Sequence, residues 1–149
     1  MSSFTLNLYS DCILSIKRGN GIKGKSKAKP LFVLSIIECI SLSLLKQNQI
    51  RWDDPNVEKL YNTLSNVYDA NNKSSILVPF YHMKSSPFYH LTWNKEEIPA
   101  ISGHTPSGKY LRENLLYAKL DDELWDLLQN AENREIIKHK IINNYLTEK

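Results

Sequence analysis

The chain has 149 residues, of which 42% are hydrophobic and 10% aromatic, and 19 Lys and Arg against 16 Asp and Glu give a formal net charge of +3. This length suits one domain, and this apolar content can build a hydrophobic core, which argues against a disordered chain. Two cysteines are too few for a disulfide scaffold or an all-cysteine metal site.

The first residues, Met1 to Leu6, carry neither the basic region nor the apolar core of a secretory signal peptide. We therefore expect a cytoplasmic protein that keeps its thiols reduced. Residues 4–16 form the first predicted element, and their pattern fits a strand as well as a helix.

Residues 17–29 form a basic arm, because no carboxylate stands between Asp11 and Glu38. The basic residues in this interval are Lys17, Arg18, Lys23, Lys25, Lys27 and Lys29. The arm also holds three of the five glycines, so it cannot bury itself and is predicted to be a flexible loop. Basic arms of this kind commonly neutralise phosphates, and each contact adds salt-dependent affinity. The alternative is a solvated loop without a partner.

Two helices are predicted next. Residues 31–45 are apolar on nearly all sides and follow Pro30, a residue well suited to the first helical turn. This segment is shorter than the ~20 residues of a membrane span, so it is predicted to be a central buried helix. Asp53-Asp54-Pro55 then supplies an N-cap and a proline for a second, amphipathic helix that ends near Tyr68.

A short aromatic motif then occurs twice, and the two copies together are called here the aromatic echo. Pro79–Met83 reads Pro-Phe-Tyr-His-Met, and Pro87–Leu91 reads Pro-Phe-Tyr-His-Leu. We interpret the two halves as the strands of a β-hairpin, and proline in both halves places them at sheet edges. In such a hairpin His82 and His90 could face the same side. A loop at residues 98–108 comes after it.

The last third is predicted to be helical again. Asp121 or Asp122 caps one helix, and a final helix begins at about Ala131 with Ile137 and Ile141 on its apolar face. The fold class expected for residues 1–149 is therefore α+β, a helix-rich single domain with a small antiparallel β-hairpin or sheet.

Catalytic patterns find little support in this sequence. Its four histidines make no HxxxH pair, and two imidazoles such as His82 and His90 hold zinc poorly without further ligands. The carboxylates of residues 121–123 stand where a helix N-terminus favours negative charge, so we prefer a cap to a metal site. No Walker loop or nucleophile elbow is present, and Cys39 lies in the most apolar helix. We expect no catalytic residue, no metal and no cofactor.

The order of several short motifs carries a resemblance to a known family. These motifs are Lys29-Pro30, Asn48-Gln-Ile50, Pro79–Met83, Phe88–Leu91, Leu111–Asn114 and Leu120–Leu128. Their order resembles the sulfur-binding domain that precedes the HNH nuclease domain in McrA-like type IV restriction enzymes. The resemblance covers roughly residues 25–146. It implies a module of a restriction–defence system that recognises phosphorothioate-modified, double-stranded DNA.

The resemblance also implies which residues approach DNA. Lys29 matches the family's Lys-Pro opening, and the basic residues just before it lie along the DNA backbone. A further basic residue after the aromatic echo, either Lys109 or Arg112, completes the site. The implied DNA-binding residues are Lys25, Lys27, Lys29, Lys109 and Arg112.

The family's apolar pocket, which surrounds the sulfur, has its own matches. The implied pocket residues are Val78, Pro79, Phe80 and His82. Val78 replaces the pocket tyrosine of the family and loses its ring, and Ser26 stands near the place of the family's arginine. A phosphorothioate sulfur is less strongly hydrated than oxygen, so burying it against apolar side chains costs less.

Three functions remain open at this point. The leading hypothesis is a DNA-binding module without catalysis, which is either a stand-alone reader that works with a separate HNH-type nuclease or a fragment of a larger enzyme. The alternative is a protein-interaction subunit whose aromatic hairpin docks a nuclease or another defence partner. The third is a small nuclease with an unrecognised site. Membrane association is not expected.

Overall fold

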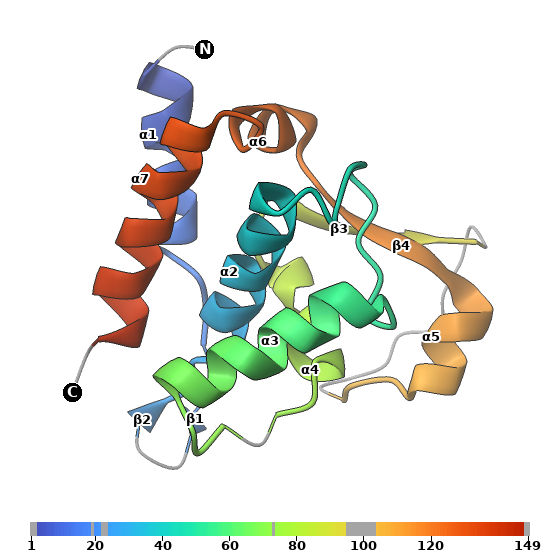
Figure 1. The fold of residues 1–149 in the computed structure, drawn as a ribbon. Helices are drawn as coiled ribbons and strands as arrows, with labels where there is room; N and C mark the ends of the chain where they lie inside the picture. The colour runs from blue at the N-terminus through green and yellow to red at the C-terminus, as the bar shows by residue number, and fades with distance from the viewer. Residues whose placement is uncertain (1–2, 19, 22–23, 73, 95–103, 148–149) are drawn as a thin grey trace.

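The most apolar segment of the sequence forms the central helix, α2 (Ala28–Ser41), which lies in the middle of the molecule (Figure 1). Its side chains are buried along nearly the whole helix, and Leu31 and Phe32 are fully inaccessible. It packs against α3 (Pro55–Tyr68), α4 (Leu77–His82) and α7 (Ala131–Ile141). A helix that is apolar all round is stable only when neighbours cover every side, and the prediction of a central buried helix is confirmed.

The computed structural model describes residues 3–18, 20–21, 24–72, 74–94 and 104–147. Its other elements are α1 (Ser3–Ile13), β1 (Asn20–Gly21), β2 (Gly24–Lys25), the 3₁₀ turn η1 (Met83–Ser85), β3 (Tyr89–Trp93), α5 (Gly108–Asn114), β4 (Leu115–Leu120), α6 (Asp122–Leu127) and the π-helical turn η2 (Ile142–Leu146). The strands form two antiparallel pairs, β1 with β2 and β3 with β4. The predicted helix-rich α+β class with a small antiparallel sheet is confirmed.

The first element, which the sequence left undecided, is the helix α1. It packs against α6 and α7. Tyr145 of η2 holds its end, because its hydroxyl donates to the carbonyl of Ile13 at 2.6 Å and accepts from the N–H of Ile16 at 3.1 Å. The guanidinium of Arg18 lies over the Tyr145 ring, 4.7 Å from its centre. The chain therefore leaves α1 in a fixed direction towards the basic arm.

The basic arm is not wholly a loop. Asn20 pairs with Lys25, and Gly21 pairs with Gly24, in a short antiparallel ladder. The prediction of a flexible loop is therefore wrong for these residues, since backbone pairing orders them. Lys23 lies outside the described residues, as does most of the predicted loop 98–108.

The predicted hairpin is wrong in its first half. Residues 79–82 belong to helix α4, and only the second half of the echo forms a strand, β3, whose partner is β4. Phe80 and Tyr81 are consecutive and both buried, which a helix surrounded by core allows but an alternating edge strand does not. The Phe80 ring packs edge-on against Phe32 and Tyr89, with centroids 6.0 and 6.4 Å apart.

The remaining helix predictions are confirmed. Asp54 is the N-cap of α3 and accepts from the N–H of Asn56 at 2.9 Å, with Pro55 in the first helical position. Helices α6 and α7 begin where the sequence placed them. Among the described residues no helix is both long and apolar enough to cross a membrane.

Candidate functional site

The basic start of α2 meets the end of α4. Lys29, in the first turn of α2, donates from Nζ to the carbonyl of Lys17 at 2.7 Å and to the hydroxyl of Ser85 at 3.2 Å. Burial, and then the charge of Lys17, lower the pKa of Lys29. Lys25 is exposed on β2, and Lys27 is half-buried at the N-cap of α2. The structure thus brings these lysines, predicted from the arm, to the helix start that faces α4.

His82, at the end of α4, lies within this basic region. Its Nε2 is hydrogen-bonded to Oγ1 of Thr105, 2.9 Å away, which ties the segment before α5 to α4. Burial, together with the charges of Lys29 and Lys84, lowers the pKa of His82. Lys84 in turn stands over the ring of Tyr81, with Nζ 4.7 Å from its centre. Lys29, His82 and Lys84 thus form one cluster, called here the basic cluster.

The predicted pocket residues differ in their exposure. Val78 is 36% exposed on α4, next to the buried Pro79. Phe80 is fully buried, so it supports α4 from the core. Val78 and His82 are therefore the members of the set with accessible surface, and both lie on α4, whose last residue, His82, belongs to the basic cluster.

Lys109 and Arg112 are exposed on α5. The Arg112 guanidinium lies over the ring of Trp52, 5.2 Å from its centre. The start of α5 is close to the same indole, because a Cβ at Gly108 would come within 2.9 Å of it. A shallow surface hollow has Arg112 and Trp52 in its wall and also reaches Phe80. Arg112 and Phe80 of α4 therefore line the same hollow.

Sequence reasoning missed Ser85, Thr105 and Trp52 as parts of this site. The contacts that bring in Ser85 and Thr105 join residues 56 and 23 positions apart. No periodicity or motif signals such pairs, since they depend on how α2, α4 and the segment before α5 pack.

The aromatic residues of the echo are core residues. Phe80, Phe88 and Tyr89 are each at most 2% exposed. The hydroxyl of Tyr89 is also satisfied, because it donates to the carbonyl of Phe80 at 2.6 Å. The exposed aromatic surface that the protein-docking hypothesis requires is therefore not made by these rings.

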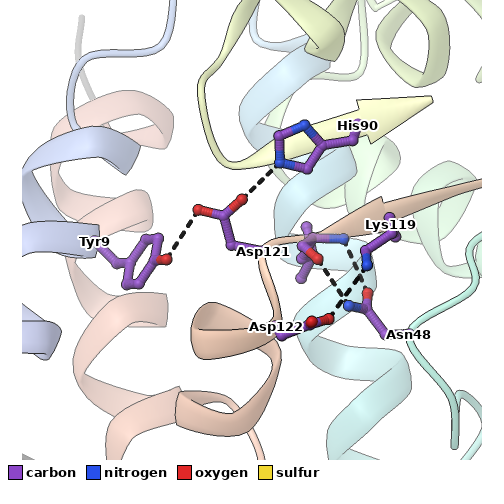
Figure 2. Close-up of polar contacts among 7 residues, drawn as sticks. Tyr9, Asn48, His90, Lys119, Asp121 and Asp122 are labelled. Atoms are coloured by element: carbon purple, nitrogen blue, oxygen red, sulfur yellow. Dashed lines mark hydrogen bonds and ion pairs between the residues drawn. The ribbon is translucent and has the colours of Figure 1, made fainter. Parts of the chain in front are cut away.

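A second polar cluster lies at the opposite end of β3 and β4 from the hollow (Figure 2). The Asp121 carboxylate accepts from the Tyr9 hydroxyl at 2.9 Å and is paired with Nε2 of His90 at 2.6 Å. Asp121 stands at the N-cap position of α6, as predicted, but its side chain makes no cap hydrogen bond and instead ties α1 to β3. His90 and His82 thus have different partners, and the prediction that they share one face of a hairpin is wrong.

Asn48 supports the same region (Figure 2). Its side-chain amide donates to the carbonyl of Leu120 at 2.7 Å and accepts from the Leu120 N–H at 2.9 Å. Ile50 continues this pairing, because its backbone exchanges two hydrogen bonds with Ala118. Through these contacts the Asn48-Gln-Ile50 motif serves the fold.

Among the described residues no three potential metal ligands lie together.

Comparison with known proteins gives a match in structure. The sequence matches no protein-family model and no curated protein. The sulfur-binding domain of ScoMcrA, solved in complex with phosphorothioated DNA, has the same fold, with a TM-score of 0.70 over 92% of this chain and 86% of that chain at 14% identity.

A second structure contains the sulfur-binding and SRA domains of ScoMcrA with phosphorothioated DNA. It matches with a TM-score of 0.72 at 14% identity, over 92% of this chain and 42% of that chain. The predicted resemblance is therefore confirmed for the fold, which is what a likeness at this identity shows.

Proposed function

We propose that this chain is a double-stranded DNA-binding module that resembles the modified-DNA reader of type IV restriction enzymes and has no catalytic site of its own. The proposal is carried by the fold shared with a domain solved in complex with phosphorothioated DNA, and by Lys29, which is bonded to Ser85 just after α4, the helix on which Val78 is 36% exposed. A positive region next to an apolar one suits a DNA strand whose backbone carries a weakly hydrated sulfur.

Backbone phosphates would be held by the lysines at the start of α2. The Lys29 ammonium has three N–H donors, and its bonds to Lys17 and Ser85 use two of them. The third can be directed to a phosphate oxygen. Lys25 and Lys27 would add further phosphate contacts, because β2 leads directly into α2. Such contacts give affinity that falls with salt and carries no sequence information.

Selectivity for sulfur would come from the surface of α4. Val78 offers methyl groups there, and Pro79 fixes the backbone beneath them in the first turn of the helix. An oxygen pressed against these groups loses hydrogen bonds to water, whereas a sulfur loses less. Lys109 and Arg112 would close the site from α5. Roles in restriction and defence, and a separate HNH-type nuclease as partner, remain predictions that follow from the same resemblance.

The test is binding of the purified chain to two duplexes that differ only in one phosphorothioate linkage, across a salt series. We expect tighter binding to the sulfur duplex and an affinity for both that falls steeply with salt. Equal, salt-sensitive binding would support a DNA-binding module and contradict the sulfur selectivity. Absence of binding to both duplexes would overturn the proposal and favour the alternative hypothesis of a protein-interaction subunit.

A matched pair of variants sharpens this test. Lys25→Ala with Lys27→Ala should lower the slope of log affinity against log salt by about 0.9 per lost contact. Lys46→Ala is the control, because Lys46 is exposed beyond the opposite end of α2 from Lys29. An equal effect per lysine removed would show that general charge, and not the position of Lys25 and Lys27 before α2, drives binding.

A further inference from the structure

A second basic site lies beside α4, in the shallow hollow below α5. Its lining includes Arg51, Trp52, Asp53 and Arg112, with the buried Phe80 beneath them. The guanidinium carbon of Arg112 lies over the Trp52 ring, 5.2 Å from its centre. The indole is itself fixed against Gly108 at the start of α5. The hollow is therefore lined by an indole with one arginine over it and another arginine nearby.

Arg51 is held at this site but remains accessible. Its Nη1 donates to the carbonyl of Leu116 at 3.3 Å, and its Nε lies 3.3 Å from Oδ1 of Asp53. The Arg51 side chain is 54% exposed and that of Asp53 is 31% exposed, so water competes with this ion pair. A guanidinium has five N–H donors, and these two contacts leave capacity for an anion.

We propose that Arg51 and Arg112 together bind a backbone phosphate of duplex DNA, and that Asp53 competes with the DNA for Arg51. The inference rests on the proposed function and adds a second contact to the same interface. Two guanidiniums at one hollow suit a phosphate, because each presents parallel N–H donors to its oxygens.

The position of the hollow supports DNA as the occupant. Phe80, in its floor, directly follows Pro79 of the proposed sulfur pocket on α4. The segment before α5 is joined to α4 by the His82–Thr105 hydrogen bond. In Figure 1 the β1–β2 pair, α4 and residues 104–107, which lead into α5, lie in the lower part of the molecule. A strand that contacts the basic cluster would therefore continue towards Arg51 and Arg112.

If Asp53 competes with DNA for Arg51, removing its carboxylate should raise the affinity for DNA, which a purely structural ion pair would not predict. Asp53 is next to the N-cap of α3 but is not the cap itself, which is Asp54. Asp53→Asn therefore keeps the helix start and removes the carboxylate from Arg51. If Arg51 binds phosphate, this change strengthens DNA binding, whereas loss of a stabilising surface pair would leave it unchanged or weaken it.

The experiment measures affinity for the plain and the phosphorothioated duplex across a salt series, with thermal melting as a check on folding. We expect Arg51→Ala to weaken binding about tenfold and to lower the salt slope by about 1, equally for both duplexes. Asp53→Asn should tighten binding about threefold at low salt. The matched controls are Lys46→Ala and Asp126→Asn, which change the same charges at exposed positions outside the hollow.

Three results would overturn the inference while wild-type binding stands. These are an Arg51→Ala effect no larger than that of Lys46→Ala, an Asp53→Asn gain no larger than that of Asp126→Asn, or a loss confined to the sulfur duplex. If Arg51→Ala lowers the melting temperature of the protein, Arg51→Lys is measured in its place, because it keeps the positive charge. The slope of its log affinity against log salt is then compared with the slope for Lys46→Arg. Failure of the wild type to bind either duplex would overturn the proposed function together with this inference.

Discussion

Lys29 and Ser85 are 56 positions apart in the chain, and Nζ of the first lies 3.2 Å from Oγ of the second. This bond joins the start of α2 to the turn that follows α4. It holds Lys29 close enough to His82 for its charge to lower the pKa of that imidazole. The proposed phosphate-binding face therefore depends on how two helices pack, and not on the basic arm alone.

DNA binding should take up a proton at His82. In the unbound protein, burial and the charges of Lys29 and Lys84 hold the pKa of His82 below its usual value of about 6.5, so the ring is neutral near pH 7. A phosphate beside it favours the charged form and raises that pKa, so affinity should increase as pH falls from about 7 to about 5. The measurement is duplex affinity across this range.

His82→Gln is the variant that tests this linkage. The glutamine amide can still hydrogen-bond to Thr105, but it cannot gain a proton. The gain in affinity at low pH should shrink in His82→Gln and persist in His139→Gln, since His139 is exposed on α7. Equal pH dependence of the wild type and His82→Gln would contradict a role for this ring.

Val78→Tyr should raise selectivity for phosphorothioated DNA. Val78 is 36% exposed, so a larger side chain can extend over the surface of α4 without entering the core. The added ring would cover more of the sulfur with apolar atoms, and we expect the ratio of the two dissociation constants to grow roughly threefold or more. Binding of the plain duplex should change little.

The control for that change is Val67→Tyr, on α3. Val67 is 68% exposed, so it accepts a ring at a place that the proposed interface does not include. A rise in selectivity with Val67→Tyr as large as with Val78→Tyr would mean that the pocket assignment is wrong.

The Tyr9–Asp121 hydrogen bond should stabilise the fold without affecting DNA. Tyr9 donates to Asp121 from α1, so Tyr9→Phe removes one partly buried hydrogen bond and should cost about 1 kcal/mol of unfolding free energy. Burial and the Asp121 carboxylate raise the pKa of Tyr9, so its contribution is complete below about pH 10 and is lost as pH rises further.

Chemical denaturation at pH 7 and above pH 10 measures both parts of this prediction. Tyr9→Phe should be less stable than the wild type at pH 7, and the difference should narrow in alkali. Tyr68→Phe on α3 serves as the comparison, because it removes a hydroxyl from a partly exposed tyrosine outside both this cluster and the hollow. A weaker affinity of Tyr9→Phe for DNA would contradict the separation of the two regions.

Cys39 should be inert to thiol reagents in the native protein. It is fully buried in α2, and burial, followed by the charges of Asp54 and Glu38, raises the pKa of its thiol to about 12. The thiolate is the reactive form, so reaction at pH 8 should be confined to the half-buried Cys12 until the chain unfolds. Titration of Cys12→Ser with an aromatic disulfide checks this, and rapid reaction of the native variant would show that α2 opens.

Much of the fold follows from signals within single segments of the sequence. The apolar run after Pro30 can only be a buried helix, and Asp54-Pro55 starts α3 through local hydrogen bonding and a preset backbone angle. The concentration of lysines before Pro30 likewise marks a positive region, because charge is visible in composition alone. These inferences require no knowledge of which distant residues come into contact in the folded chain.

Only the tertiary structure decided what the aromatic echo becomes and where the basic residues meet. The same Pro-Phe-Tyr-His pattern forms the helix α4 at residues 79–82 and leads into the strand β3 at residues 87–90, because the first copy packs around Phe32 and the second pairs with β4. Packing and pairing between distant segments outweigh local propensity in such short stretches. For the same reason the contacts of Lys29 with Ser85, and of Arg112 with Trp52, exist only once the helices have assembled.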